Sequence, residues 1–406
     1  MGEQNSDARM LRDDLVNTLS ERGGICSARV LAAFRQAPRH VFLPGVDLAR
    51  AYSDEAIPTK WETDGRPISS SSQPSVMALM LEQLDVEPGQ RVLEIGAGTG
   101  YNAAILDDLV GSDGAVTTLD IDDEVATSAR RQLAATGHAR VRVVCADGAS
   151  GWSDGAPYDR IMLTVGAEDV AQAWVDQLAG GGRLVLPLSL RGCQRSVAFA
   201  RCGDHLVSQS IIDCGFMPLR GSLARPGTVR SLGDEPGVLL RLPDEREVDT
   251  AALYAALRLP GGALSTGVSA SRAEVLGGLG LWLALHQPDI GQLTAHGAAV
   301  DRGLVPTLVA FPGMTLTTVL LGDRAMAALV FAEPDEVPTD RFDLWVRLLG
   351  PDAADLGRQL TDQVRAWDLR GRPSTADLRI RAYPRAGADV LPGSLDTPQG
   401  RLMLNW

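Results

Sequence analysis

The spacing of hydrophobic positions changes along the chain, and each change predicts a different kind of structure. Residues 8–36 carry apolar side chains at helical spacing and are interrupted by a pair of glycines, which predicts two short helices. Pro74–Leu84 shows a further helical pattern that begins with a proline, a residue favoured in the first turn of a helix. From Arg91 to about residue 215, short apolar runs alternate with amphipathic stretches. Such alternation predicts an α/β domain, with a mostly parallel sheet covered by helices on both faces.

The pattern after residue 215 is different and predicts a second domain. Residues 221–237 are rich in Gly, Pro, Ser and Arg and suit a connection. Val248–Leu257 and Ala353–Trp367 have helical patterns, and several apolar runs between them suit strands, so we expect a C-terminal α+β domain of about 150 residues. The expected parts are an N-terminal helical and substrate-loop segment at 1–69, the α/β domain at 70–215, a linker at 216–240 and the C-terminal domain at 241–406.

Composition excludes several classes of function. The chain has 406 residues, with 51 acidic and 38 basic side chains and a formal charge of −13, which argues against a broad nucleic-acid surface. Its five cysteines form no CxxC pair, and its five histidines are scattered without metal-ligand spacing. No apolar run approaches the ~20 residues of a membrane span, and the first residues lack a secretory pattern. We expect a cytoplasmic protein that binds no nucleic acid, membrane or metal; the sequence leaves its oligomeric state open.

One glycine-rich motif indicates a nucleoside cofactor. Residues 94–100 read E-x-G-x-G-x-G, directly after a predicted strand and before a predicted helix. Asp120 ends the next predicted strand, where a carboxylate can accept hydrogen bonds from both hydroxyls of a ribose. The dinucleotide fingerprint GxGxxG would need a glycine at position 101, which is Tyr101. The register is instead typical of Rossmann-like class I methyltransferases, which bind S-adenosylmethionine.

The predicted cofactor site is formed by the residues that follow or end three strands, namely the glycine motif, Asp120 and Asp147–Gly148. Glu94 is expected near the cationic methionyl end of the cofactor, and the Asp147–Gly148 turn after a later strand is expected to contact the adenine. The alternatives are that the glycines merely shape a turn and that Asp120 caps a helix. The predicted cofactor-binding residues are Glu94, Gly96, Ala97, Gly98, Thr99, Gly100, Tyr101, Asp120, Ile121, Asp147 and Gly148.

Several segments resemble protein-L-isoaspartate O-methyltransferases. The resemblance rests on residues 31–58, on GRPIS at 65–69, on VLEIGAGTGYNAA at 92–104 and on LAGGGRLVLP at 178–187. It covers roughly residues 8–215. It implies the class I methyltransferase fold, a carboxyl methyl transfer and S-adenosylmethionine as cofactor, with S-adenosylhomocysteine as product.

The sequence departs from that family after Ile68. The family usually continues its Ile-Ser with Ala-Pro-His-Met-His, whereas this chain reads Ser-Ser-Ser-Ser-Gln-Pro at 69–74. This variant, the Cys214–Pro218 segment and the long C-terminal extension resemble a subgroup encoded with ribosomal peptide products, in FxLD-type lanthipeptide and graspetide pathways. That resemblance implies a modified precursor peptide as partner and substrate. Methylation of one of its aspartate side chains would lead to an aspartimide, an isoaspartate or both.

The chemistry implied needs no acid–base triad, because a carboxylate with an ordinary pKa near ~4 is already a nucleophile at neutral pH. Catalysis then consists of alignment and exclusion of water. Ser69 matches the family's catalytic hydroxyl, and Ser70 is a second candidate; backbone N–H groups at 165–167 are further candidates for holding the carboxylate. Arg39 is a candidate for binding an anionic peptide. The predicted substrate-binding residues are Ser71, Ser72, Gln73, Val165 and Gly166.

Three interpretations of function remain open at this point. The first is methylation of an aspartate in a biosynthetic peptide. The second is methylation of isoaspartate in damaged proteins, against which the serine variant and the extension count. The third is a cofactor-binding module without turnover, and for the serine run itself the alternative is a flexible loop with helix-capping roles.

Overall fold

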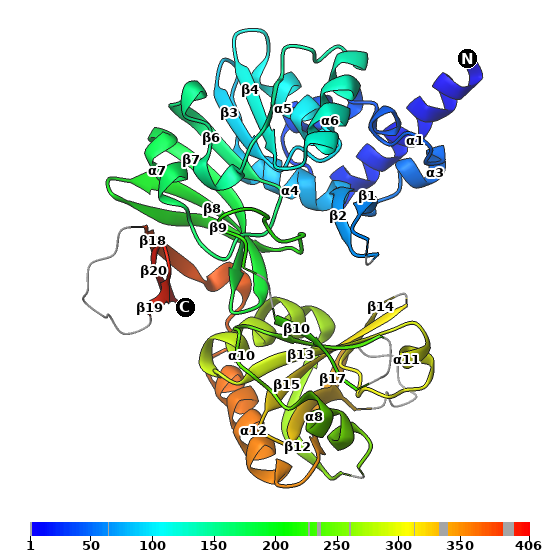
Figure 1. Cartoon of the computed structure of the whole chain (residues 1–406), viewed down its shortest axis with the longest axis vertical. Coiled ribbons are helices and arrows are strands. Elements are labelled where there is room, and N and C mark those ends of the chain that lie inside the picture. Colours follow the sequence, from blue (N-terminus) through cyan, green and yellow to red (C-terminus); the bar gives the residue numbers. More distant parts are fainter. Residues whose placement is uncertain are drawn as a thin grey trace. The chain divides into compact units, whose positions relative to one another are not determined.

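The computed structural model describes residues 2–63, 65–225, 228–233, 237–259, 261–311, 313–332, 340–384 and 394–406. The chain forms two compact units (Figure 1). Unit 1 comprises Met1–Leu188, Gln194–Arg225 and Arg379–Asn405. Unit 2 comprises Ser189–Cys193, Pro226–Leu378 and Trp406.

The N-terminal part of unit 1 contains the two predicted helices and one hairpin that was not predicted. Helices α1 (Gly2–Glu21) and α2 (Ala28–Gln36) are separated at the paired glycines, as the pattern predicts. A 3-10 turn, η1 (Arg39–Phe42), and the short helix α3 (Leu48–Ala51) follow. Strands β1 (Ile57–Trp61) and β2 (Pro67–Ser71) then form an antiparallel hairpin. Each strand contains a proline, which obscures a strand pattern in the sequence.

A sheet with parallel strands forms the centre of unit 1, which confirms the class I methyltransferase fold. Strand β3 pairs in parallel with β4 and β6, β4 pairs in parallel with β5, and β6 with β7. Helices α5 and α6 lie beside β3 and β4 (Figure 1). The bounds are β3 Arg91–Ile95, β4 Ala115–Asp120, β5 Arg142–Cys145, β6 Tyr158–Leu163, β7 Leu178–Leu190, α4 Pro74–Leu84, α5 Tyr101–Val110, α6 Asp123–Ala135 and α7 Gln172–Gln177.

This topology determines where a site can form. Because β3, β4, β5 and β6 run in the same direction, their carboxyl ends lie at one edge of the sheet. The glycine motif follows β3, Asp120 ends β4 and Asp147 follows β5. The three predicted cofactor turns therefore share that edge.

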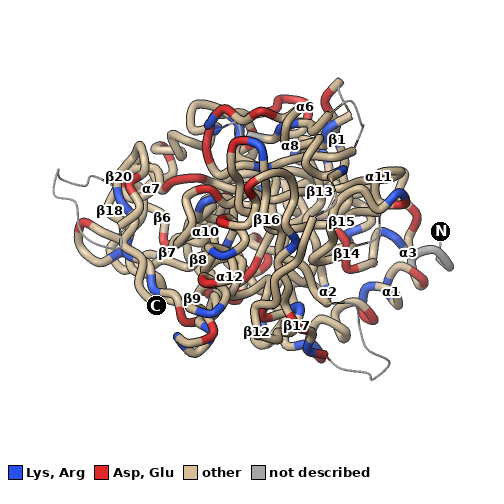
Figure 2. The backbone as a smooth tube through the Cα atoms, turned by 90° about the horizontal axis from the view of Figure 1, so that it is seen from below, with Lys and Arg blue, Asp and Glu red and all other residues tan. Residues whose placement is uncertain are grey.

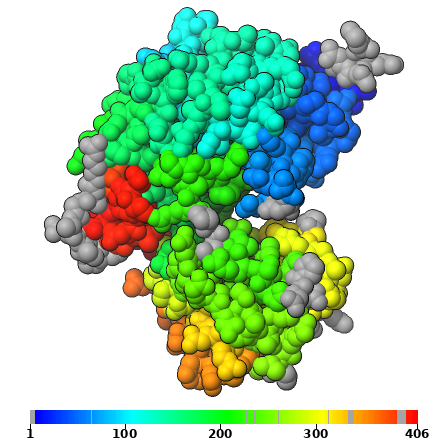
Figure 3. Space-filling view, viewed as in Figure 1, coloured from blue at the N-terminus to red at the C-terminus, as the bar shows by residue number. Residues whose placement is uncertain are grey.

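The far end of the same sheet contains residues that we expected in the second domain. The full strand order is β19-β20-β18-β9-β8-β7-β6-β3-β4-β5. Strand β9 pairs antiparallel with β8 and β18, and Figure 3 shows the red C-terminal strands against the green of this region. The alternating segment Arg-Ile-Arg-Ala-Tyr of β18 supplies backbone partners to β9, which would otherwise be an open edge. The bounds are β8 Cys193–Cys202, β9 His205–Asp213, β18 Arg379–Tyr383, β19 Ser394–Thr397 and β20 Gly400–Asn405.

Unit 2 is an α+β fold of its own. Its sheet has the order β10-β11-β13-β15-β16-β17-β12, and β14 pairs with β15. Strand β10 and the first residues of β11 fall within 216–240, so part of the predicted linker is sheet. The strands are β10 Thr228–Ser231, β11 Val238–Leu242, β12 Ala263–Ser271, β13 Ile290–His296, β14 Val309–Phe311, β15 Met314–Leu321, β16 Met326–Phe331 and β17 Arg341–Leu349. The helices are α8 Thr250–Leu257, α9 Arg272–Glu274, α10 Gly280–His286, α11 Ala298–Asp301 and α12 Ala353–Leu369.

Charged residues of both signs are spread among the elements of the protein (Figure 2). Among the described residues, no group of three or more His, Cys, Asp and Glu side chains is arranged to hold a metal ion. Within the same described residues, no helix has the length and apolar character needed to span a membrane.

Candidate active site

The glycine motif forms a tight turn between β3 and α5. Gly96, Gly98 and Gly100 all have positive φ, at 105°, 51° and 86°, where other residues are strained. A side chain at Gly96 would clash with the Thr164 hydroxyl, because its Cβ would lie 2.5 Å from that oxygen. The turn is also held by the N–H groups of Gly96 and Ala97, which both donate to the Leu119 carbonyl at 2.8 Å.

The other two predicted turn residues are buried. Thr99 is 8% exposed, and Tyr101 begins α5 with its ring packed edge-on against Phe34. Burial raises the pKa of the Tyr101 phenol. Tyr101 therefore anchors the helix that follows the turn, and its ring lies in the core of unit 1.

Glu94 lies inside the protein beneath the turn. It has no exposed surface, and its two carboxylate oxygens accept hydrogen bonds from the Thr118 hydroxyl at 2.5 Å and the Asn102 amide at 2.7 Å. Burial raises its pKa from 4.5 to about 7, against the effect of both hydrogen bonds. These contacts tie β3 to β4 and α5, so Glu94 has a clear role in shaping the turn; its placement near a methionyl group stays a prediction.

Asp120 ends β4 with its carboxylate beside the glycine turn. One oxygen accepts a hydrogen bond from the Gly98 N–H and the other accepts one from the Asp122 N–H, each at 3.1 Å. The guanidinium of Arg220 lies 3.7 Å away. Burial raises the pKa of Asp120, although these three groups all favour its charged form. The next residue, Ile121, exposes 39% of its surface.

Asp147 and Gly148 follow β5 at the same edge. The Asp147 carboxylate accepts hydrogen bonds from the Ala149 N–H at 2.9 Å and the Ser222 N–H at 2.8 Å. Burial alone would raise the Asp147 pKa, but these N–H groups outweigh it and hold the pKa below its usual value. Gly148 is required by packing, since a Cβ there would lie 2.3 Å from the Ile95 side chain.

A segment at 216–222 crosses this edge and was not predicted to contribute. Met217 accepts the Gly166 N–H, and the Leu219 N–H donates to the Gly166 carbonyl, both at 2.7 Å. Further along the segment, Arg220 reaches Asp120 and Ser222 reaches Asp147. The segment thus connects the ends of β6, β4 and β5. This segment has no hydrophobic periodicity in the sequence. Only the resemblance of Cys214–Pro218 to the peptide-modifying subgroup indicated that it has a special role.

The pairing of Gly166 corrects one expectation about the substrate. Backbone N–H groups at 165–167 were candidates for holding a carboxylate. The Gly166 N–H is taken by Met217, and the Ala167 N–H donates to the Pro187 carbonyl at 2.8 Å. The half-buried Val165 lies against the glycine turn, 3.1 Å from the position of a Cβ at Gly96.

The β1–β2 hairpin brings the serine run to the glycine turn. Ser69 is buried and its Oγ accepts a hydrogen bond from the Thr59 hydroxyl at 3.3 Å. The backbone carbonyl of the half-buried Ser70 lies 3.1 Å from where a Cβ at Gly98 would stand. Ser71 lies on the same face of β2 as Ser69, and its buried hydroxyl has no hydrogen-bond partner among the described residues. Ser69 and Ser70 therefore lie in a strand, not in a flexible loop.

The end of the serine run is fixed by buried and half-buried contacts. Arg39 has no exposed surface and donates to the carbonyls of Ala51, Ser53, Glu55 and Ser72 at 2.8–3.1 Å. This corrects the idea that Arg39 binds an anionic peptide, because its guanidinium is enclosed by backbone oxygens. The Gln73 amide donates to Asp54 at 3.3 Å, immediately before α4.

The comparisons with known proteins agree on the family of unit 1. The sequence profile of the protein-L-isoaspartate(D-aspartate) O-methyltransferase (PCMT) family matches residues 10–224. The protein-L-isoaspartate O-methyltransferase of Methanopyrus kandleri is 40% identical over 223 residues, covering 54% of this chain and 96% of the relative. That of Roseiflexus castenholzii is 41% identical over 203 residues, covering 50% of this chain and 89% of the relative.

One solved structure resembles this chain over more than residues 10–224, the region that the family profile matches. A chain named protein-L-isoaspartate O-methyltransferase superposes with a TM-score of 0.51 at 24% identity, covering 91% of this chain and 96% of its own. That likeness concerns the fold alone. Because it extends well past residue 224, a long extension also accompanies the methyltransferase fold in a protein of that name.

Proposed function

The chain belongs to the protein-L-isoaspartate(D-aspartate) O-methyltransferase family of S-adenosylmethionine-dependent carboxyl methyltransferases, and from this premise we propose that it methylates the free carboxylate of L-isoaspartyl residues in proteins or peptides. The observation that carries the proposal is the family match over residues 10–224, which spans every predicted site residue. The relatives at about 40% identity are aligned over nearly their whole length. The sequence alone favoured a biosynthetic peptide, and these findings favour isoaspartate instead.

The residues at the carboxyl edge fit the nucleoside part of the cofactor. Each oxygen of Asp120 accepts one backbone N–H and keeps a further lone pair with which to accept a ribose hydroxyl. The exposed side chain of Ile121 offers apolar surface beside it, and the half-buried Gly96 and Gly98 add no side chain of their own to the turn. When bound, S-adenosylmethionine supplies a methyl group on a positively charged sulfonium.

The hairpin supports a role for its serines in holding the substrate carboxylate. A serine hydroxyl has one proton and two lone pairs, so Ser69 can accept a hydrogen bond from Thr59 and still donate its own proton to a carboxylate. The hydroxyl of Ser71, without a partner among the described residues, is a second donor on the same face. Hydroxyl groups can orient a carboxylate without protonating it, so the nucleophile stays charged. We assign Ser69 to alignment of the acceptor, which is the main requirement of this reaction. The role predicted for Ser70, which lies on the other face of β2, stays a prediction.

A second candidate function is methylation of one aspartate side chain in a dedicated peptide. The specific observation in its favour is the run Ser69–Ser72 before Gln73 and Pro74, which departs from the Ala-Pro-His-Met-His of the resembled family. Unit 2 would then recognise the peptide. The long extension no longer counts against isoaspartate, since the solved chain of that name also aligns well past residue 224.

Paired peptides separate the candidates. Two synthetic peptides that differ only in L-isoaspartate or L-aspartate at one position are incubated with the protein and methyl-labelled S-adenosylmethionine, beside the modified precursor peptide encoded nearest to the gene. Base-labile label on the isoaspartyl peptide alone supports the proposal. Label only on the precursor peptide supports the second candidate. Cofactor binding by calorimetry without any transfer would contradict both and leave a binding module.

A further inference from the structure

Lys60 lies directly across the β1–β2 hairpin from the serine assigned to the substrate. In the antiparallel pairing Lys60 is the partner of Ser69, with an irregularity of register on each side of Lys60. The preceding residue, Thr59, donates its hydroxyl hydrogen bond to Ser69. Lys60 is also the single lysine of the chain. Its backbone position is therefore linked to that of Ser69 by the hairpin itself.

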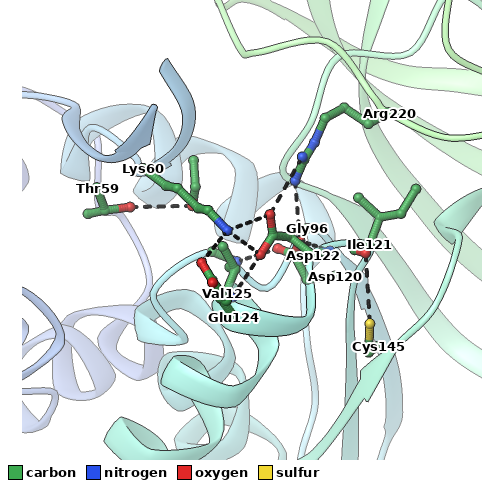
Figure 4. Close-up of polar contacts among 12 residues, drawn as sticks. Thr59, Lys60, Gly96, Asp120, Ile121, Asp122, Glu124, Val125, Cys145 and Arg220 are labelled. Carbon is green, nitrogen blue, oxygen red and sulfur yellow. Dashed lines mark hydrogen bonds and ion pairs between the residues drawn. The ribbon is translucent and has the colours of Figure 1, made fainter. Parts of the chain in front are cut away.

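The Lys60 side chain leaves the hairpin and binds the turn that follows β4. Its Nζ lies 2.7 and 2.8 Å from the two oxygens of Asp122 and 2.7 Å from Glu124 (Figure 4). The side chain of Asp122 is 14% exposed, whereas that of Glu124 is 83% exposed. Exposed ion pairs contribute little, so Asp122 is the important partner. The hydrogen bonds that Lys60 donates to Asp122 and Glu124 raise the pKa of Lys60 and keep it an ammonium.

Asp122 connects Lys60 to the proposed ribose acid. Its N–H donates to Asp120 at 3.1 Å, and its carboxylate caps α6 by accepting the Val125 N–H at 3.1 Å. Arg220 lies 3.8 Å from Asp122 on the side away from Lys60 and 3.7 Å from Asp120 (Figure 4). A group that binds Asp120 therefore acts on the same short turn that holds the ammonium of Lys60.

The hairpin has a second point of contact with the same region. The Ser70 carbonyl faces Gly98, whose N–H donates to Asp120. The hairpin is thus fastened near Asp120 by Lys60 on β1, and Ser70 on β2 lies close to the glycine turn. Movement of the turn at 120–122 would be transmitted to the hairpin, and so to Ser69, through the ion pair of Lys60.

We propose that Lys60 is a positioning residue, which couples binding of a nucleoside at Asp120 to the placement of Ser69 through its ion pair with Asp122. This inference rests on the proposed function, in that Asp120 holds the cofactor and Ser69 the acceptor. When the turn at 120–122 is ordered, Asp122 holds the ammonium of Lys60 in place, and Lys60 in turn holds the β1–β2 hairpin. The coupling is reciprocal: the factor by which a bound nucleoside strengthens the Lys60–Asp122 ion pair is also the factor by which that pair strengthens nucleoside binding at Asp120. Loss of Lys60 therefore weakens nucleoside binding.

Chemical labelling of the single lysine tests the coupling without any methyl acceptor. The rate of acylation of Lys60 is measured by mass spectrometry, relative to a lysine-containing reference peptide in the same tube, with and without saturating S-adenosylhomocysteine. We expect the ligand to slow acylation at least about fivefold in the unmodified protein. Asp122→Asn keeps a helix-capping side chain but removes the charge, and it should reduce that protection to below about twofold. Asp123→Asn, which removes an exposed neighbouring charge, is the matched control and should retain the full protection.

Two labelling results would overturn the proposal. One is the absence of protection in the unmodified protein at proven saturation. The other is equal protection in Asp122→Asn, which would mean that the ligand covers Lys60 directly. Because the assay needs only the cofactor product, it stays informative if no isoaspartyl peptide is methylated.

Kinetics separate positioning from a purely structural role. Lys60→Gln should lower kcat for an isoaspartyl peptide about tenfold at saturating cofactor, and Lys60→Arg should restore most of that loss. Both variants are compared per folded molecule, with folding checked by circular dichroism. A fall in melting temperature with unchanged kcat would contradict the assignment.

Discussion

The hydroxyl of Thr118 donates a hydrogen bond of 2.5 Å to the carboxylate of Glu94, at a position where neither side chain reaches solvent. Burial raises the pKa of Glu94 from 4.5 to about 7. The folded protein therefore binds a proton there between about pH 4.5 and pH 7 that the unfolded chain has lost. Stability from this group is present at low pH and is lost as the pH rises through 7.

This relationship predicts a pH-dependent stability that one substitution removes. The free energy of unfolding should fall by up to about 3 kcal/mol between pH 5 and pH 8 through Glu94, since one pKa unit corresponds to about 1.4 kcal/mol. Glu94→Gln keeps the shape and cannot ionise, so its urea midpoint should change less over the same range. Parallel curves for the two proteins would show that the pKa of Glu94 is not raised in the folded state.

Asp120→Ala should weaken binding of S-adenosylhomocysteine by about 1–3 kcal/mol, the scale of hydrogen bonds lost to a charged group. Isothermal calorimetry measures this directly. Thermal unfolding in the absence of ligand provides the control, because Asp120 also accepts the N–H groups of Gly98 and Asp122. An unchanged affinity would show that the ribose does not lie at the end of β4.

Ser69→Ala should lower kcat for an isoaspartyl peptide at least about tenfold, as expected for a lost hydrogen bond to a carboxylate. Cofactor affinity should change little, because the Ser69 hydroxyl has its one described hydrogen bond within the hairpin, to Thr59. Steady-state kinetics and calorimetry on the same preparation give both values. Equal losses in turnover and affinity would remove the role assigned to Ser69.

Arg39→Ala should destabilise unit 1 by about 3 kcal/mol or more, because four buried or partly buried carbonyls would lose their donor together. Urea unfolding followed by circular dichroism checks this value. Arg39→Lys should recover only part of the stability, since an ammonium cannot span the same four oxygens. A loss below about 1 kcal/mol would mean that water replaces the guanidinium easily.

Local pattern was sufficient to predict most of the methyltransferase sheet. Strands β3, β4 and β6 are five or six residues long and carry buried apolar side chains, and the E-x-G-x-G-x-G spacing predicts the turn whose glycines have positive φ. These features depend on neighbours in sequence. The sequence could not show that the Glu94 carboxylate points inward, because that depends on Thr118 and Asn102 from two other elements.

Features that depend on distant pairing were missed. No local pattern marked Lys60, since its partner Asp122 is 62 residues away. Arg220 and Ser222 lie in a segment without periodicity and matter only because it crosses the ends of three strands. Strand β18 joins β9 across more than 160 residues of chain, so no local signal separates it from the second domain.

The ratio of kcat/KM for the L-isoaspartyl peptide to that for its L-aspartyl twin tests the central claim most directly. The two acceptors differ only in which carboxylate is free, so the ratio reports how the site recognises that group. The account predicts a ratio above about 100, or nearly 3 kcal/mol of discrimination in the transition state. A ratio near one or below it, with measurable transfer, would contradict isoaspartate as the substrate.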